Sequence, residues 1–123
     1  MNKPSALLAA SLAALSSAHA APCPGNADAL GTARVLDVDV AAMPRVGRKQ
    51  FPQTLPLKPK EVVLTFDDGP WPATTERVLD TLKAECVRAT FFLIGRNALA
   101  RPALAQRELA DGHTVAYSVF PAG

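Results

Sequence analysis

The sequence lacks a strong excess of charge of either sign. Its 123 residues include 13 Lys and Arg against 11 Asp and Glu, which leaves a formal net charge of +2 with histidine neutral. Proteins that bind nucleic acid need many positive charges opposite the phosphates. We therefore expect no nucleic-acid partner, and the length is that of a single small domain.

Apolar runs long enough to cross a membrane are also missing. The run Ala6–Leu15 is shorter than the roughly 20 residues that a helix needs to span a bilayer. It follows the charged Lys3 and precedes the small-residue pattern Ala18-His19-Ala20, an arrangement typical of a secretory signal peptide. We expect residues 1–20 to be this signal, and the mature chain to be secreted or periplasmic with no stable membrane span.

Cysteine is scarce, with 2 residues in the chain. After export, Cys23 and Cys86 would meet an oxidising compartment, where a disulfide between them is possible. Cys86 also ends an apolar helical stripe and could equally be a buried small apolar residue, with Cys23 free. The sequence leaves both alternatives open.

Proline and glycine are concentrated before residue 61. This segment, residues 21–60, contains 6 of the 11 prolines and 3 of the 7 glycines, which excludes long helices and central strands. We predict a Pro-rich N-terminal arm that lies on the following domain. One short strand is expected at Arg34–Val40, where side chains alternate between two faces.

From residue 61 onward, apolar runs alternate with helical stripes, as in β-α units around a parallel sheet. Glu61–Phe66 and Ala89–Ile94 are predicted as strands buried within the sheet, the first of them on both faces. A third strand is expected to start at Thr114–Ala116. The predicted fold class is therefore α/β, with the order β-α-β-α-β.

Two helices are predicted between these strands. The first has apolar residues at three- and four-residue steps up to Cys86 and could be capped by Thr74. The second is placed from about Pro102, a favourable first-turn residue, to Ala110, with Gly112 as its stop.

The candidate site is the string TFDDGP at residues 65–70. Asp67 and Asp68 follow a predicted buried strand, and active sites of parallel α/β folds lie at the carboxyl ends of their strands. A turn at Gly69-Pro70 could bring both carboxylates to one pocket, where a cation would hold one and leave the other free as a base. Alternatively, the string is a plain turn whose carboxylates bond nearby backbone amides.

From Glu61 to His113 the sequence resembles the NodB-type polysaccharide deacetylases, which are carbohydrate esterases. Four segments carry the resemblance in the family's order and spacing: TFDDGP at 65–70, Val78-Leu79 with Leu82, ATFFLIG at 89–95, and GHTV at 112–115. The resemblance implies that residues 61–123 are a truncated deacetylase domain, and that the fold is an incomplete (β/α) barrel.

The resemblance also implies roles for the acidic pair. Asp67 would be the general base that deprotonates water for attack on an N-acetyl carbonyl, and Asp68 would be a ligand of a divalent metal, commonly zinc. The substrate would be an acetylated polysaccharide: an N-acetylglucosamine polymer such as chitin oligomers or peptidoglycan, or O-acetylated xylan. Trp71, just after the turn, could stack on a sugar face or pack over the loop.

The sequence departs from the family where its pair of histidine ligands would follow. Residues 116–121 read AYSVFP and contain neither histidine of the family's His-Ser/Thr-x-x-His motif. His113 matches a residue that precedes the metal site, so we expect it to cap the second helix or pack beneath the third strand. One carboxylate alone does not hold zinc tightly.

We therefore predict a deacetylase domain that is inactive as this truncated chain. The alternative is a non-catalytic carbohydrate-binding or interaction module. A phosphoacceptor domain of the response-regulator kind also carries acidic residues at a strand end, but export and the Gly-Pro after Asp68 argue against it.

Overall fold

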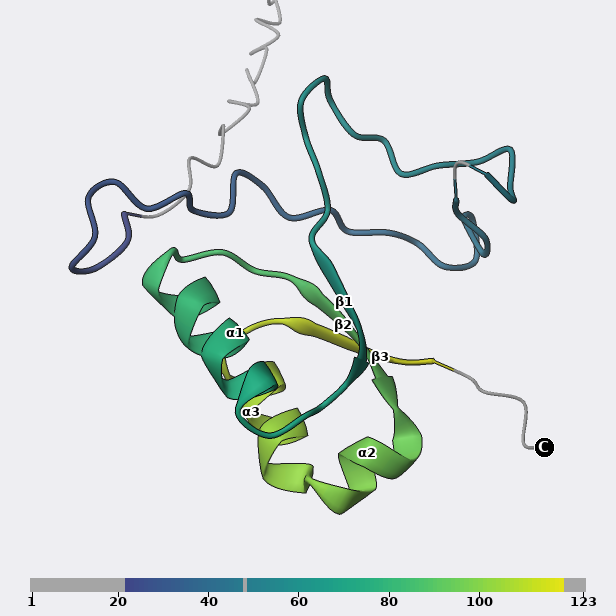
Figure 1. Cartoon of the computed structure of the whole chain (residues 1–123). Helices are drawn as coiled ribbons and strands as arrows, with labels where there is room; N and C mark the ends of the chain where they lie inside the picture. Colours follow the sequence, from purple (N-terminus) through teal and green to yellow (C-terminus); the bar gives the residue numbers. More distant parts are fainter. Residues whose placement is uncertain (1–21, 48, 119–123) are drawn as a thin grey trace, which may run out of the picture.

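The computed structural model of this protein describes residues 22–47 and 49–118 (Figure 1). The predicted signal peptide lies outside the described residues, as does the end of the AYSVFP stretch. None of the helices within the described ranges is long and apolar enough to cross a membrane.

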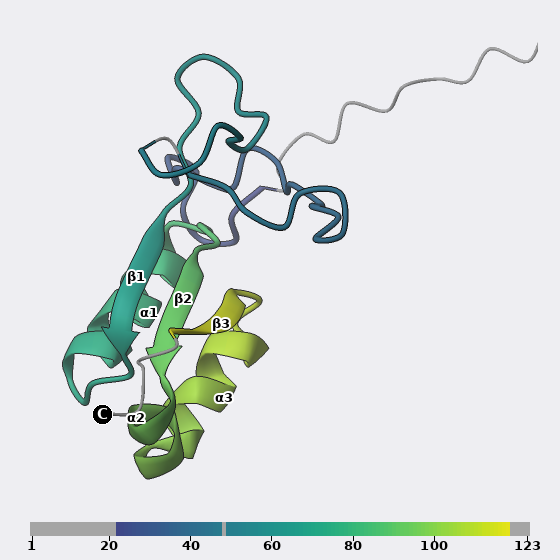
Figure 2. The ribbon, with the colours of Figure 1, turned by 90° about the vertical axis from the view of Figure 1, so that its right-hand side faces the viewer.

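In the described part of the chain, parallel strands form one sheet in the order of the sequence (Figure 2). They are β1 (Thr65–Gly69), β2 (Thr90–Ile94) and β3 (Thr114–Ser118). The pairing of β2 with β3 is regular from Thr90↔Thr114 to Ile94↔Ser118, whereas that of β1 with β2 is interrupted. The predicted α/β class with a parallel sheet is confirmed.

Three helices are present among the described residues: α1 (Thr74–Ala84), α2 (Gly95–Ala100) and α3 (Pro102–Ala110). Helices α1 and α3 lie on one side of the sheet, and α2 lies at the carboxyl end of β2 (Figures 1 and 2). The second predicted helix matches α3, with Pro102 in its first turn, whereas α2 was not predicted.

The predicted cap of α1 at Thr74 is wrong. Ala73 occupies the cap position with φ 60°, and no side chain bonds the first turn as a cap. Instead, the next residue, Thr75, is buried and its Oγ1 accepts a hydrogen bond from the backbone N–H of Trp71 at 2.9 Å. The Thr75 hydroxyl therefore bonds the loop before the helix and does not cap the N–H groups of the helix's first turn.

The apolar core lies between the sheet and helices α1 and α3. Phe91 and Leu93 point into it from β2, and the rings of Phe66 and Phe91 stack with their centroids 5.1 Å apart. Phe92 and Ile94 alternate to the opposite face, where they are only half-buried. The buried apolar residues of the core are Leu79, Leu82, Ala89, Phe91, Leu93 and Ala98.

The first strand begins later than predicted and is not buried on both faces. Residues 61–64 are outside the sheet, and Val62 is 86% exposed. The reason is the position of the partner: β2 itself begins at Thr90, whose N–H bonds Leu64 O at 3.0 Å. Residues before Leu64 therefore have no neighbouring strand to pair with in the described structure.

The predicted strand at Arg34–Val40 is also wrong, because this segment has no regular structure and no described strand beside it. Val35 and Val40 are 70% and 77% exposed. The arm, residues 22–60, lies at the amino ends of the strands, opposite to the end where the TFDDGP string finishes (Figure 2).

The arm is attached to the loop between α1 and β2 by the disulfide Cys23–Cys86, which the sequence left open. Beside it, Asn26 Nδ2 donates to Ala84 O at 3.0 Å and Gly31 N to Glu85 O at 2.9 Å. We call residues 23–32 with this loop the arm clasp. A bidentate ion pair joins Arg34 of the arm to Glu61, the residue after the arm, with nitrogen–oxygen distances of 2.8 and 2.7 Å.

Candidate active site

A β-bulge shapes the acidic end of β1. Asp67 is opposite Phe92, but the next pair is Gly69↔Leu93, so Asp68 is the extra residue. Its φ is 67°, a left-handed conformation that aspartate tolerates better than most residues. In a regular strand Asp68 would face Leu93, which is fully buried. The bulge places Gly69 there instead and keeps the carboxylate out of the core.

The bulge is held by a residue that the sequence did not reveal. Asn97, on α2, is 7% exposed and donates from Nδ2 to the backbone oxygen of Asp68 at 3.1 Å. The feature of the sequence that could have revealed Asn97 is its position shortly after the second predicted strand. Parallel neighbouring strands end at the same edge of a sheet, so a polar residue there can reach the loop that follows β1.

Both carboxylates of the predicted site are exposed to solvent. Asp67 shares the sheet face opposite the helices with Phe92, because cross-strand partners point to the same side. Within the described residues neither carboxylate is hydrogen-bonded to a backbone amide. A hollow of about 370 Å³ beside α1 and β1 is lined by other residues, so a pocket shared by the acidic pair stays a prediction.

Trp71 is rigidly positioned next to the acidic pair. Its backbone N–H donates to Thr75 Oγ1 at 2.9 Å, and its carbonyl accepts the Thr75 N–H at 2.9 Å. The neighbouring residues Pro70 and Pro72 restrict the chain on both sides. Trp71 is 50% exposed, so half of its surface is open to solvent, and whether its ring binds a sugar stays a prediction.

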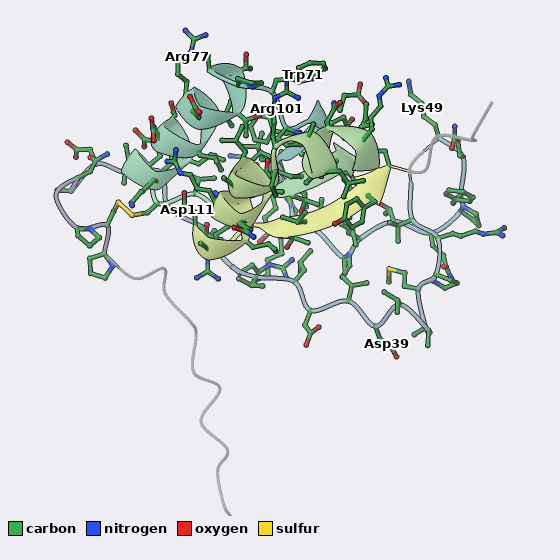
Figure 3. The ribbon with its side chains drawn as sticks, turned by 90° about the horizontal axis from the view of Figure 1, so that it is seen from below. Asp39, Lys49, Trp71, Arg77, Arg101 and Asp111 are labelled. Atoms are coloured by element: carbon green, nitrogen blue, oxygen red, sulfur yellow. A yellow bond between two sulfur atoms is a disulfide. The ribbon has the colours of Figure 1, made fainter. Side chains whose placement is uncertain are left out.

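Arg101 lies beside this indole (Figure 3), its guanidinium carbon 5.5 Å from the ring centroid. The residue stands between α2 and α3, where its N–H bonds Asn97 O at 3.0 Å and its carbonyl accepts the Leu104 N–H at 3.2 Å. Such cation–π contacts are favourable because the ring face is electronegative. No periodic pattern in the sequence predicts this pair.

The residues described do not assemble a metal site. No group of three or more His, Cys, Asp or Glu side chains that could hold a metal ion occurs among them. His113 is buried, its ring packs edge-on against Phe91 with centroids 5.2 Å apart, and its Nδ1 accepts the Ala89 N–H at 3.2 Å. Of the two roles expected for the His113 side chain, a helix cap or packing beneath the third strand, the structure shows packing, but against Phe91 of β2.

Glu108 and His113 are buried polar residues on and just after α3. The carboxylate oxygens of Glu108 and Nε2 of His113 have no hydrogen-bond partner among the described residues. Burial raises the pKa of Glu108 to about 7. Burial also lowers the pKa of His113, against the nearby negative charge of Asp111. Both shifts favour the neutral forms.

The family model of the polysaccharide deacetylases matches residues 54–117, more than half of the chain. The chain belongs to the polysaccharide deacetylase family. The match includes the TFDDGP string and all three strands up to Tyr117. It confirms the resemblance that the sequence motifs carried.

Several named relatives match the same half of the chain. The peptidoglycan-N-acetylglucosamine deacetylase PgdA of Listeria monocytogenes is 52% identical over 56 residues, 46% of this chain and 12% of that protein. The chitooligosaccharide deacetylase of Sinorhizobium fredii is 56% identical over 55 residues, 45% of this chain and 26% of that protein. This chain thus spans only a minor part of either relative.

Among solved structures, the peptidoglycan deacetylase PdaC from Bacillus subtilis is 41% identical, with a TM-score of 0.47. The similarity covers 50% of this chain and 30% of that chain.

Proposed function

We propose that this chain carries the acidic part of a deacetylase site for acetylated amino-sugar polymers of the chitooligosaccharide or peptidoglycan type. The observation that carries the proposal is the bulge at Asp68, which exposes two adjacent carboxylates at the carboxyl edge of the sheet. The names of the relatives support the substrate class. In this proposal the three strands are the opening units of an incomplete (β/α) barrel.

Asp67 is proposed as the general base. Its carboxylate would take a proton from a water molecule as the water oxygen attacks the carbonyl carbon of an N-acetyl group. Cleavage of the carbon–nitrogen bond then releases acetate, and the proton passes to the departing amine. Exposure of Asp67 on the open face of the sheet leaves room for a sugar chain.

Asp68 is proposed as a ligand of a divalent metal such as zinc, which would polarise the acetyl oxygen. The described residues do not fit this ion by themselves, because they offer no cluster of three ligands and catalytic zinc sites use several protein donors. We therefore propose that the isolated chain binds its glycan but releases little acetate. Its proposed location is secreted or periplasmic, where such polymers occur.

The test is to restore the family's histidine motif. A variant with one histidine inserted after Tyr117 and another after Phe120 would read His-Ser-Val-Phe-His. With added zinc, we expect this variant to bind the ion and release acetate from an acetylated chito-oligomer, and Asp67→Asn to abolish the release. Rapid acetate release by the unaltered chain would contradict the incomplete site, and acetate release that persists in the histidine variant carrying Asp67→Asn would contradict the role of Asp67.

A non-catalytic carbohydrate-binding module is the second candidate, and the half-exposed Trp71 favours it. Aromatic rings bind sugars through their flat apolar faces. If this candidate is right, Trp71→Ala abolishes glycan binding, Asp67→Asn leaves it unchanged, and the histidine variant still releases no acetate.

A further inference from the structure

Trp71 and Arg101 are held by independent parts of the fold and meet at the edge where the acidic pair lies. The backbone of Trp71 forms two hydrogen bonds with Thr75, donating to its hydroxyl and accepting from its N–H, at 2.9 Å each. The backbone of Arg101 is held at the junction between α2 and α3. Because the backbone of each residue is anchored, the pair is positioned before a ligand arrives.

The guanidinium of Arg101 has unused hydrogen-bonding capacity. Within the described residues it forms no salt bridge, in contrast to Arg34 and Arg107, which both pair with carboxylates. A guanidinium presents its N–H groups in a planar fork that matches a carboxylate. The contact with the indole orients this fork without consuming its donors.

We propose that Trp71 and Arg101 together recognise a carboxylate-bearing sugar of the glycan, so that the site prefers an acidic acetylated polymer over a neutral one. The indole would stack on the sugar ring, and Arg101 would bind the carboxylate. The inference rests on the proposed function and deepens it by naming the substrate class.

The surrounding charges agree with this polarity. Asp67 and Asp68 repel an anionic group, so a carboxylate on the sugar must lie away from them. Arg101 and the exposed Arg96, the second residue of α2, supply positive charge on the α2 side of the same edge. An acidic glycan would thus be oriented with its carboxylate toward α2 and a neighbouring acetamide toward the acidic pair.

The single tryptophan of the chain makes the test direct, because its fluorescence reports only on Trp71. The full chain is titrated at low salt with an oligomer of N-acetylglucosamine and N-acetylmuramic acid, and with the same oligomer after amidation of its carboxylates. We expect the acidic oligomer to bind about threefold more tightly, as for an exposed ion pair. High salt should remove the difference.

Arg101→Gln should remove the preference for the acidic oligomer over the amidated one, and Arg101→Lys should retain part of this preference. Lys49→Gln removes one positive charge from the arm, well apart from Trp71 (Figure 3), and serves as the matched control. Circular dichroism verifies that each variant folds. Equal binding of the two oligomers, or a preference that survives in Arg101→Gln, overturns the inference but leaves glycan binding intact. Absence of quenching by both oligomers would contradict the proposed function as well.

Discussion

Glu108 is a buried carboxyl group whose ionisation would destabilise the fold. Its side chain is fully buried, with neither carboxylate oxygen hydrogen-bonded among the described residues. Its neighbour Leu109 is 59% exposed. The acidic residue is thus buried and the apolar one exposed, the reverse of the usual arrangement. A buried carboxyl without a partner is best tolerated when it is protonated.

This burial predicts that stability falls as the pH rises. The pKa of Glu108 is raised from 4.5 to about 7, so between these values the folded state binds more protons than the unfolded state. From the size of this pKa shift, the free energy of unfolding should fall by about 3 kcal/mol between pH 4.5 and 7. Glu108→Gln, which is neutral at every pH, should remove this decline in urea unfolding measured at a series of pH values.

His113 provides the internal control for that experiment. Because burial lowers its pKa, its contribution is lost as the pH falls below its ordinary value, which is the opposite direction. Asp111 and Arg88 act on His113 with opposite signs. This slope is present in both the natural chain and Glu108→Gln, so it cancels in the comparison. Equal pH profiles for the two proteins would show that Glu108 reaches solvent.

A second residue-scale prediction concerns Asn97. Asn97→Ala removes the hydrogen bond to Asp68 O and leaves a small cavity in a buried position. We expect a loss of about 1–2 kcal/mol in the free energy of unfolding. The amide resonances of Asp67 and Asp68 should shift in NMR spectra, because the bulge loses its support. A destabilised variant with unchanged resonances at these residues would assign Asn97 to packing alone.

At the scale of elements, the sequence predicted what local patterns control. Helix α3 was placed correctly because Pro102 and Gly112 delimit it. Strand β2 was placed correctly because its apolar run is short and continuous, and β3 because it follows the stop at Gly112. The start of β1 depends on where β2 begins, and Arg34–Val40 failed because no strand lies beside it. Short helix α2 starts at Gly95 and has no apolar stripe to reveal it. The left-handed Asp68 arises from the bulge, which is a property of pairing between strands.

The arm clasp yields a prediction at this same scale. The disulfide joins residues separated by 63 positions. Closing such a loop lowers the conformational entropy of the unfolded chain and can stabilise the folded state by up to about 4 kcal/mol. Reduction, or Cys86→Ser, should lower stability by an amount up to this limit. Hydrogen exchange should accelerate at Leu30 and Gly31, whose N–H groups bond Glu85. Exchange at Phe91 in the core should change only through the loss of global stability.

The sequence also predicted the candidate site only in part. Asp67, Asp68 and Trp71 could be proposed because they belong to, or directly follow, a recognisable string. Thr75 was missed although it is only four residues from Trp71. Asn97 and Arg101 were missed because they reach this string from another element, and their contacts arise only when α2 packs at the end of β2. A sequence motif therefore predicts the contiguous part of such a site, and not the residues that other elements contribute.

For the whole molecule, the uneven covering of the sheet has a consequence in solution. Helices cover one face, while the opposite face, with Phe92 and Ile94, is half-buried. Tyr117 on β3 is 67% exposed, and in the described structure no strand pairs with the outer edge of β3. Exposed strand edges with apolar side chains favour association between chains.

We therefore expect the purified chain to self-associate as its concentration rises, as measured by sedimentation velocity. Tyr117→Lys should weaken this association, because a charge on an edge strand opposes pairing with a second chain. Leu99→Lys is the matched control, since Leu99 is 84% exposed on α2, away from a strand edge. If both variants weaken association equally, general surface hydrophobicity drives it. If only Tyr117→Lys does so, the chains meet along the edge of β3.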